Sequence, residues 1–135
     1  MQTDRIQKQI EKNPYIEYLG IEFLEVSEEY ARAKLMLRED LKNPMGTLHG
    51  GVLYSLADIV AGTAATMRGN YVTTVSGEFS YLSPGIHTEY VIAEAKMIRF
   101  GAHLAVYRID ILDDKGNTLD IATFTYFDVG VKVSE

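Results

Sequence analysis

The segment from residue 49 to residue 67 constrains the fold more than any other part of the sequence. It predicts one long helix, and from Val52 onward this helix carries a single charged residue, Asp58. A helix that is apolar nearly all round has to be buried on most of its sides. Its small residues would let a sheet approach closely: Ala57, Ala61, Gly62, Ala64 and Ala65. We therefore expect a sheet that wraps around this helix.

Strand-like runs lie on both sides of the helix. Before it, residues 3–13 predict a short amphipathic helix that Pro14 ends, and residues 21–26 and 30–38 predict a hairpin. After it come four longer runs that predict strands, at residues 72–82, 88–99, 102–112 and 118–129. Successive strands without helices between them are typical of α+β proteins. The sequence thus predicts an α+β domain in which about six antiparallel strands wrap one long helix.

Charge and cysteine content exclude several classes of function. The net charge is -6 and no basic block occurs, so we expect no nucleic-acid partner, although a local basic spot for a phosphate is compatible with this charge. The absence of cysteine excludes disulfides, thiolate catalysis and Cys-ligated metal sites. The first residues do not resemble a signal peptide and no run could span a membrane. We therefore expect a cytoplasmic protein without membrane contact.

Three familiar enzyme motifs are absent. The segment "GTLHGG" has the glycine spacing of a phosphate-binding loop, but Gly-Val follows where that loop needs Lys-Ser/Thr. No Gly-x-Ser-x-Gly of a serine hydrolase occurs. The histidines are not spaced to bind zinc as a His-x-x-x-His pair, so no metal site is expected: His49, His87 and His103.

The start of the long helix and Asp58 remain as candidates for chemistry. Gly50 and Gly51 leave the first backbone N–H groups unshielded, at the positive end of the helix dipole, and Asn43 and His49 could add donors. Asp58 is a candidate general base or nucleophile. Each feature also has a structural explanation: a buried acid bound to a strand, glycines that allow close packing, and a histidine that caps the helix. Their combination in one loop–helix unit favours function.

The stretch "NPMGTLHGGVLYSLAD" resembles the signature of hotdog-fold acyl-CoA thioesterases of the PaaI-like, phenylacetate-pathway type. That branch has an Asn, a Gly-x-x-His-Gly-Gly and an Asp in the following helix, which here are Asn43, Gly46, His49, Gly50, Gly51 and Asp58. It also has a Ser or Thr on the next strand. Counting back from Pro84 in "TTVSGEFSYLSPG" places that hydroxyl at Thr74, with Thr73 and Ser76 close by. The resemblance implies a single hotdog thioesterase domain over residues 1–135.

The resemblance implies hydrolysis of an aryl or short- to medium-chain acyl-CoA, with no cofactor besides the CoA of the substrate. The Gly50 N–H polarises the thioester carbonyl, and Asn43 and His49 position the carbonyl or the leaving thiolate. Asp58 activates water or attacks directly, and Thr74 orients the water.

The resemblance also implies a binding site for the coenzyme. It runs along the strand after the helix and the turn between the next two strands, with these residues in contact: Gly51, Ser76, Tyr81, Arg99, Phe100, Gly101 and His103. Arg99 is the candidate phosphate contact. An ordinary hairpin turn with an exposed Arg is the alternative explanation of the segment "RFGAH".

The spacing of Gly50 and Asp58 predicts a dimer. At ~1.5 Å per residue, Asp58 lies about 12 Å along the helix from Gly50, whereas reacting atoms approach within ~3–3.5 Å. One helix therefore cannot supply both groups to one substrate. We expect a homodimer with antiparallel central helices and shared active sites, as in hotdog proteins. We expect such dimers to pair into a tetramer, although the sequence does not decide between dimer and tetramer.

Two other functions fit the same fold. The alternative is a non-catalytic acyl-CoA binding or sensing module, although such sensors usually carry a DNA-binding segment for which this chain has no room. A dehydratase or hydratase is a third option, but its usual His-based dyad is not evident. The sequence does not identify the acyl group.

Overall fold

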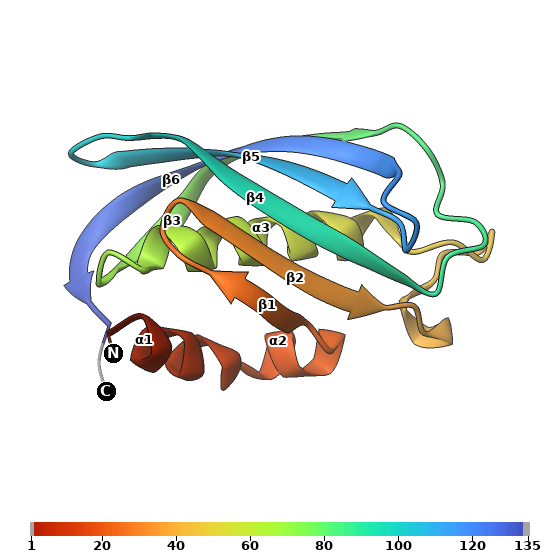
Figure 1. Ribbon diagram of the computed structural model, residues 1–135, viewed down its shortest axis with the longest axis horizontal. Helices are drawn as coiled ribbons and strands as arrows, with labels where there is room; N and C mark the ends of the chain where they lie inside the picture. Colours follow the sequence, from red (N-terminus) through yellow and green to blue (C-terminus); the bar gives the residue numbers. More distant parts are fainter. Residues whose placement is uncertain (1, 134–135) are drawn as a thin grey trace.

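The computed structural model describes residues 2–133 and contains one long helix within a curved sheet (Figure 1). The helices are α1 (Gln2–Glu11), α2 (Pro14–Leu19), the 3-10 turn η1 (Glu39–Leu41) and α3 (Gly50–Thr66). The strands are β1 (Glu22–Val26), β2 (Tyr30–Met36), β3 (Asn70–Tyr81), β4 (Tyr90–Phe100), β5 (Leu104–Leu112) and β6 (Thr118–Lys132). The predicted hairpin, long helix and four following strands are all present.

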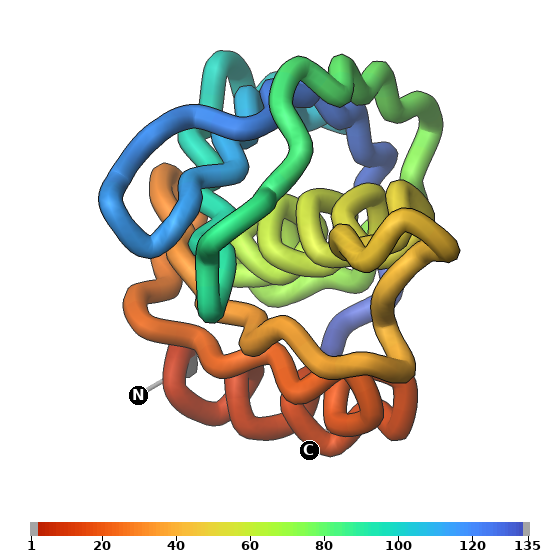
Figure 2. Tube along the Cα trace, turned by 90° about the vertical axis from the view of Figure 1, so that its right-hand side faces the viewer, coloured from red at the N-terminus to blue at the C-terminus, as the bar shows by residue number. Residues whose placement is uncertain are grey.

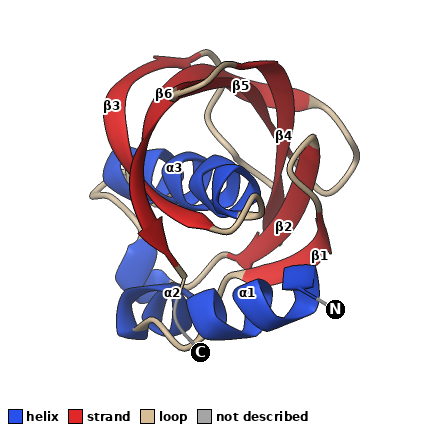
Figure 3. Cartoon of the chain, turned by 90° about the vertical axis from the view of Figure 1, so that its left-hand side faces the viewer, coloured by secondary structure: helices blue, strands red, loops and turns tan. Residues whose placement is uncertain are grey.

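The six strands form one antiparallel sheet in the order β1-β2-β4-β5-β6-β3. The sheet curls around α3, with α1 and α2 on the remaining side (Figures 2 and 3). This arrangement confirms the predicted α+β hotdog architecture, in which the sheet wraps the apolar helix. Among the described residues, no helix combines the length and apolar character that crossing a lipid bilayer requires.

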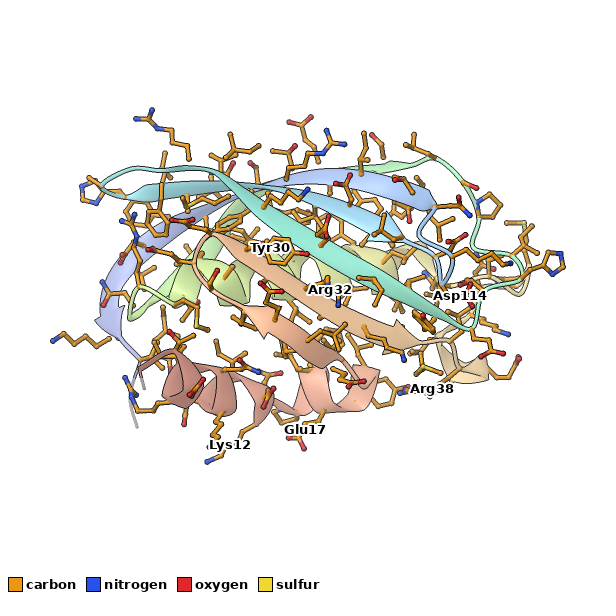
Figure 4. All side chains as sticks on the ribbon, viewed as in Figure 1. Lys12, Glu17, Tyr30, Arg32, Arg38 and Asp114 are labelled. Carbon is orange, nitrogen blue, oxygen red and sulfur yellow. The ribbon has the colours of Figure 1, made fainter. Side chains whose placement is uncertain are left out.

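Small residues let the sheet lie close to α3. On β2, Ala31, Ala33 and Leu35 alternate inward and are fully buried, as a strand with one face on the core requires. They meet the equally buried small residues of the helix, Ala57, Ala61 and Ala64. Charged side chains such as Lys12 and Glu17 point outward from the molecule (Figure 4).

The first helix ends at Glu11, before Pro14 as predicted, but the prediction missed the helix that follows it. A second helix, α2, begins at Pro14, because proline lacks the N–H that a first helical residue does not need. The side chain of Asn13 caps it by accepting from the N–H groups of Tyr15 and Ile16. Gly20, at φ +75°, ends it. The hydroxyls of Tyr15 and Ser55 share a 2.7 Å hydrogen bond, which joins α2 to α3.

Strand β3 forms an edge of the sheet. It pairs with β6 from Asn70↔Lys132 to Tyr81↔Asp120, so both strands extend beyond their predicted ends. No other strand within residues 2–133 pairs with its outer edge. Its side chains are half-buried or exposed on both faces, and Val75 is 56% exposed. A long edge strand of this kind offers unpaired backbone groups to another chain.

Candidate active site

The loop before α3 is shaped by Asn43. Its Oδ1 accepts from the N–H groups of Met45 (3.0 Å) and Thr47 (3.2 Å), and its Nδ2 donates to the Thr47 hydroxyl (2.9 Å). Gly46, at φ +85°, completes the tight turn in a backbone region that favours glycine. Asn43 therefore fixes the loop that leads into the helix, with one amide hydrogen left to donate.

His49 and Gly50 form the start of α3. The His49 Nδ1 accepts from the Gly51 N–H at 3.3 Å, so His49 is the N-cap of the helix. A neutral imidazole whose Nδ1 accepts carries its proton on Nε2, which is then free to donate. No acceptor for the Gly50 N–H occurs in residues 2–133. The Tyr81 hydroxyl donates to the Gly50 carbonyl at 2.7 Å, which ties β3 to the helix start.

Asp58 lies in the middle of α3, half-buried against β3 and β6. Its Oδ1 accepts from the Thr74 hydroxyl at 2.8 Å and from the Tyr126 hydroxyl at 3.0 Å. Of the three hydroxyls considered from the sequence, Thr74 is the one that contacts Asp58. The other carboxylate oxygen of Asp58, Oδ2, receives no hydrogen bond from the described part of the chain. One carboxylate oxygen is therefore held and the other is available.

The two halves of the predicted site open into different cavities of the single chain. Asn43, Gly50 and Tyr81 line a cavity of about 400 Å³. Asp58 and Thr74 line another of about 200 Å³, with Ile10, Ile16 and Tyr126. One chain therefore does not bring Gly50 and Asp58 to a common cavity.

Tyr54 occupies the helix surface between the two halves. It is four residues from both Gly50 and Asp58, so all three share one helix face. Its ring packs edge-on against Phe124 with centroids 5.0 Å apart. The strand passes close by at Gly77, where a Cβ would lie 2.6 Å from the Phe124 ring. Glycine at this position lets β3 approach the aromatic side chain that divides the helix face.

The residues predicted to bind CoA fall into separate groups. Arg99 and Phe100 end β4, and Gly101 to His103 form the turn to β5, at the opposite end of the molecule from the loop that leads into α3 (Figure 1). Ser76 is exposed on β3. Arg99 is exposed, while the Phe100 ring lies 3.3 Å from the Arg68 guanidinium and the His103 ring stacks on Phe127. A single chain does not bring this turn and Gly50 together.

Two buried polar residues near the site were not predicted. Tyr126 reaches Asp58, and Asp120 lines the cavity beside Gly50 while only 1% exposed. Its Oδ2 has no hydrogen-bond partner among residues 2–133. Burial raises the pKa of Asp120 to about 6, against a smaller lowering by the Leu82 N–H. Strand alternation was the available signal for Tyr126, since Ala122, Phe124 and Tyr126 all face inward.

Known proteins are similar to this chain in sequence and in architecture. A family model described as the thioesterase superfamily matches residues 45–119. The acyl-coenzyme A thioesterase PaaI of Escherichia coli is 27% identical over 101 residues, covering 75% of this chain and 72% of that protein.

Solved structures have the same fold. The structure of E. coli PaaI, from the phenylacetic acid degradation operon, superposes with a TM-score of 0.92 over 98% of this chain and 97% of that one, at 22% identity. A thioesterase from Haemophilus influenzae gives 0.81 at 26% identity, over 90% of this chain and 86% of that one. The family match spans more than half of the chain, and the sheet-wrapped helix agrees with it. The chain therefore belongs to the thioesterase superfamily and has the hotdog fold.

Proposed function

We propose that this protein is an acyl-CoA thioesterase that hydrolyses an aryl or short- to medium-chain acyl-CoA to the free acid and CoA. Its similarity to the PaaI thioesterase supports the substrate class. The observation that carries the proposal is the Asp58–Thr74 pair, with Oδ1 held at 2.8 Å and Oδ2 available. A carboxylate held in this way beside a cavity is suited to act on a water molecule.

The hydrogen bonds at Asp58 favour base catalysis over direct attack by the carboxylate. The Thr74 hydroxyl donates its only proton to Asp58 Oδ1, so it can only accept from a water molecule. A water that donates one hydrogen to Asp58 Oδ2 and the other to Thr74 presents a lone pair to the thioester carbon. Asp58 takes a proton from this water as the water oxygen bonds to the thioester carbon.

The start of α3 supplies the other part of the reaction. The Gly50 N–H, with no acceptor among the described residues, donates to the oxygen that gains negative charge as water attacks. Collapse of the intermediate breaks the carbon–sulfur bond and restores the carbonyl. The departing thiolate takes up the proton that Asp58 accepted from the water, which returns Asp58 to its carboxylate form, and the Nε2–H of His49 donates a hydrogen bond to the sulfur.

The complete site needs two chains under this proposal. One subunit supplies Asn43, His49 and Gly50, and its partner supplies Asp58 and Thr74. The separate cavities and the intervening Tyr54 support this division. The unpaired edge of β3 supports a dimer, because such an edge can pair with its copy about a two-fold axis. Pairing of such dimers into a tetramer is part of the proposal.

A thiol-release assay tests the function. Phenylacetyl-, benzoyl-, short-chain and long-chain acyl-CoAs are compared, and we expect release with one class at least. Asp58→Asn should lower kcat by roughly 10²–10⁴, because an amide cannot accept the proton, while binding persists. Release by Asp58→Asn at the wild-type rate would refute the assignment of the base. Binding of acyl-CoA by the wild-type protein without any release would favour the alternative, a binding module.

A further inference from the structure

Two strands hold the Asp58 carboxylate. Thr74 reaches it from β3, and Tyr126 reaches it from β6. The Tyr126 hydroxyl lies 3.0 Å from Asp58 Oδ1 and 2.8 Å from the backbone oxygen of Asp58. Its single proton is shared between these two acceptors. Tyr126 therefore contacts both the side chain and the main chain of the same residue.

Gly62 makes room for this contact. It lies one helical turn after Asp58, and a Cβ at this position would be 3.3 Å from Cε1 of Tyr126 and 3.8 Å from its hydroxyl. A side chain at position 62 would therefore press on the tyrosine ring. Because glycine stands here, the buried ring can lie against α3 with its hydroxyl beside Asp58.

The Tyr126 hydroxyl is a permanent donor. Burial, and then the negative charge of Asp58, raise the pKa of Tyr126 well above its usual value. Both effects disfavour the phenolate, so the hydroxyl keeps its proton near neutral pH. It is not suited to exchange protons with a substrate, and its chemistry is limited to donating a hydrogen bond.

We propose that Tyr126 is a positioning residue for catalysis: its hydroxyl, together with that of Thr74, holds Asp58 Oδ1 so that Oδ2 faces the cavity where water and substrate meet. The proposal rests on the proposed function, in which Asp58 is the base. One donor alone leaves a carboxylate freer to turn about its Cβ–Cγ bond. Two donors from different strands restrict that rotation and fix the direction of the free oxygen.

Tyr126→Phe tests the proposal, since it removes the hydroxyl and keeps the ring. We expect kcat to fall roughly 10- to 100-fold for the acyl-CoA that the wild-type protein hydrolyses fastest, because the base is no longer held in place. KM should hardly change, since the Tyr126 hydroxyl that is removed is engaged with Asp58.

Tyr107→Phe is the matched control. Tyr107 is equally buried, its ring centroid lies 6.2 Å from that of Tyr126, and its hydroxyl donates to the Glu28 carbonyl, away from Asp58. It should lose a similar amount of thermal stability while kcat and KM stay at wild type. If both variants keep wild-type kcat, or if both lose it equally, the positioning role of Tyr126 is wrong.

Gly62→Ala gives an independent answer if Tyr126→Phe does not fold. Its methyl group displaces the ring while the hydroxyl remains, and alanine favours the helix. We expect a lower kcat with only a small fall in the melting temperature, because the helix preference of alanine offsets part of the cost of moving the ring, and wild-type kcat would overturn the proposal. Asp58→Asn distinguishes a failure of the positioning role of Tyr126 from a failure of the proposed function of Asp58. If it is inactive while Tyr126→Phe is fully active, only the positioning role fails; if it is fully active, the proposed function of Asp58 fails as well.

Discussion

Asp120, in the cavity beside Gly50, makes the stability of the protein depend on pH. Its carboxyl is buried and its Oδ2 lacks a partner within residues 2–133. Burial raises its pKa from 3.8 to about 6, so the folded chain holds this proton over a pH range in which the unfolded chain has released it. The contribution to stability therefore falls as pH rises from about 4 to about 6, and the loss is complete above that range.

We expect Asp120→Asn to be more stable than the wild-type protein at about pH 7.5, and to lose most of this advantage at about pH 4.5. The full shift from 3.8 to about 6 is worth roughly 3 kcal/mol at about 1.4 kcal/mol per pKa unit, and about a third of this loss is already present at about pH 4.5, so the two conditions should differ by roughly 2 kcal/mol. Urea unfolding of both proteins at both pH values measures it, and other titrating groups cancel in the comparison. A difference between variant and wild type that does not change with pH would contradict this account.

Single residues also show the limits of prediction from this sequence. Thr74 could be found because the Ser/Thr position is defined by its distance from Pro84. Tyr126 and Asp120 lie on β6, far along the chain from α3. Their positions beside this helix depend on which strand pairs with β3. Alternation placed Tyr126 on the inner face, but only the strand order β5-β6-β3 brings it beside Asp58.

At the scale of elements, periodicity predicted α3 and the later strands well, because apolar faces dictate their burial. The first helix ends before Pro14 as predicted, but the second helix, α2, was missed, because proline is compatible both with a stop and with a helix start. Asn13 decides between these by capping α2. The start of β3 and the end of β6 were also missed. Asn70 and Lys132 extend these strands because they pair with each other, and this pairing is not visible in the sequence.

The turn between β4 and β5 carries the prediction for coenzyme binding. If Arg99 binds a phosphate of CoA, Arg99→Ala should raise KM for the acyl-CoA, and the salt dependence of KM should weaken. The same acyl group on a truncated thiol without the nucleotide should be almost unaffected. Steady-state kinetics with both thioesters measure this.

Arg108→Ala serves as the control for Arg99→Ala. Arg108 is also exposed, on β5, where it pairs with Asp110 at 3.1 Å, and its removal changes the net charge equally. It should leave KM unchanged. Equal increases in KM for the acyl-CoA and for the truncated thioester would instead mean that Arg99 acts through the structure of the turn.

At the scale of the whole molecule, mixed dimers test the two-chain site. His49→Ala and Asp58→Ala each damage both sites of a pure dimer. When equal amounts are unfolded and refolded together, about half of the dimers should be mixed, each with one intact site. Activity should then recover to roughly a quarter of the wild-type value.

Thiol release, with mixed dimers confirmed by mass, measures this recovery. Activity that stays at the level of the parents would show that each site comes from a single chain. If His49→Ala alone is only weakly impaired, Gly50→Pro replaces it, because proline removes the proposed N–H donor.

The strand order also dictates a sequence of events during folding. Strand β3 follows α3 directly in the chain, yet it pairs with β6, which is made only after β4 and β5. Contacts between segments so far apart form slowly, because a large loop has to close first. Thr74 and Tyr126 should therefore reach Asp58 only when this pairing forms, so a chain still emerging from the ribosome contains Asp58 without the two hydrogen bonds that it accepts in the folded protein.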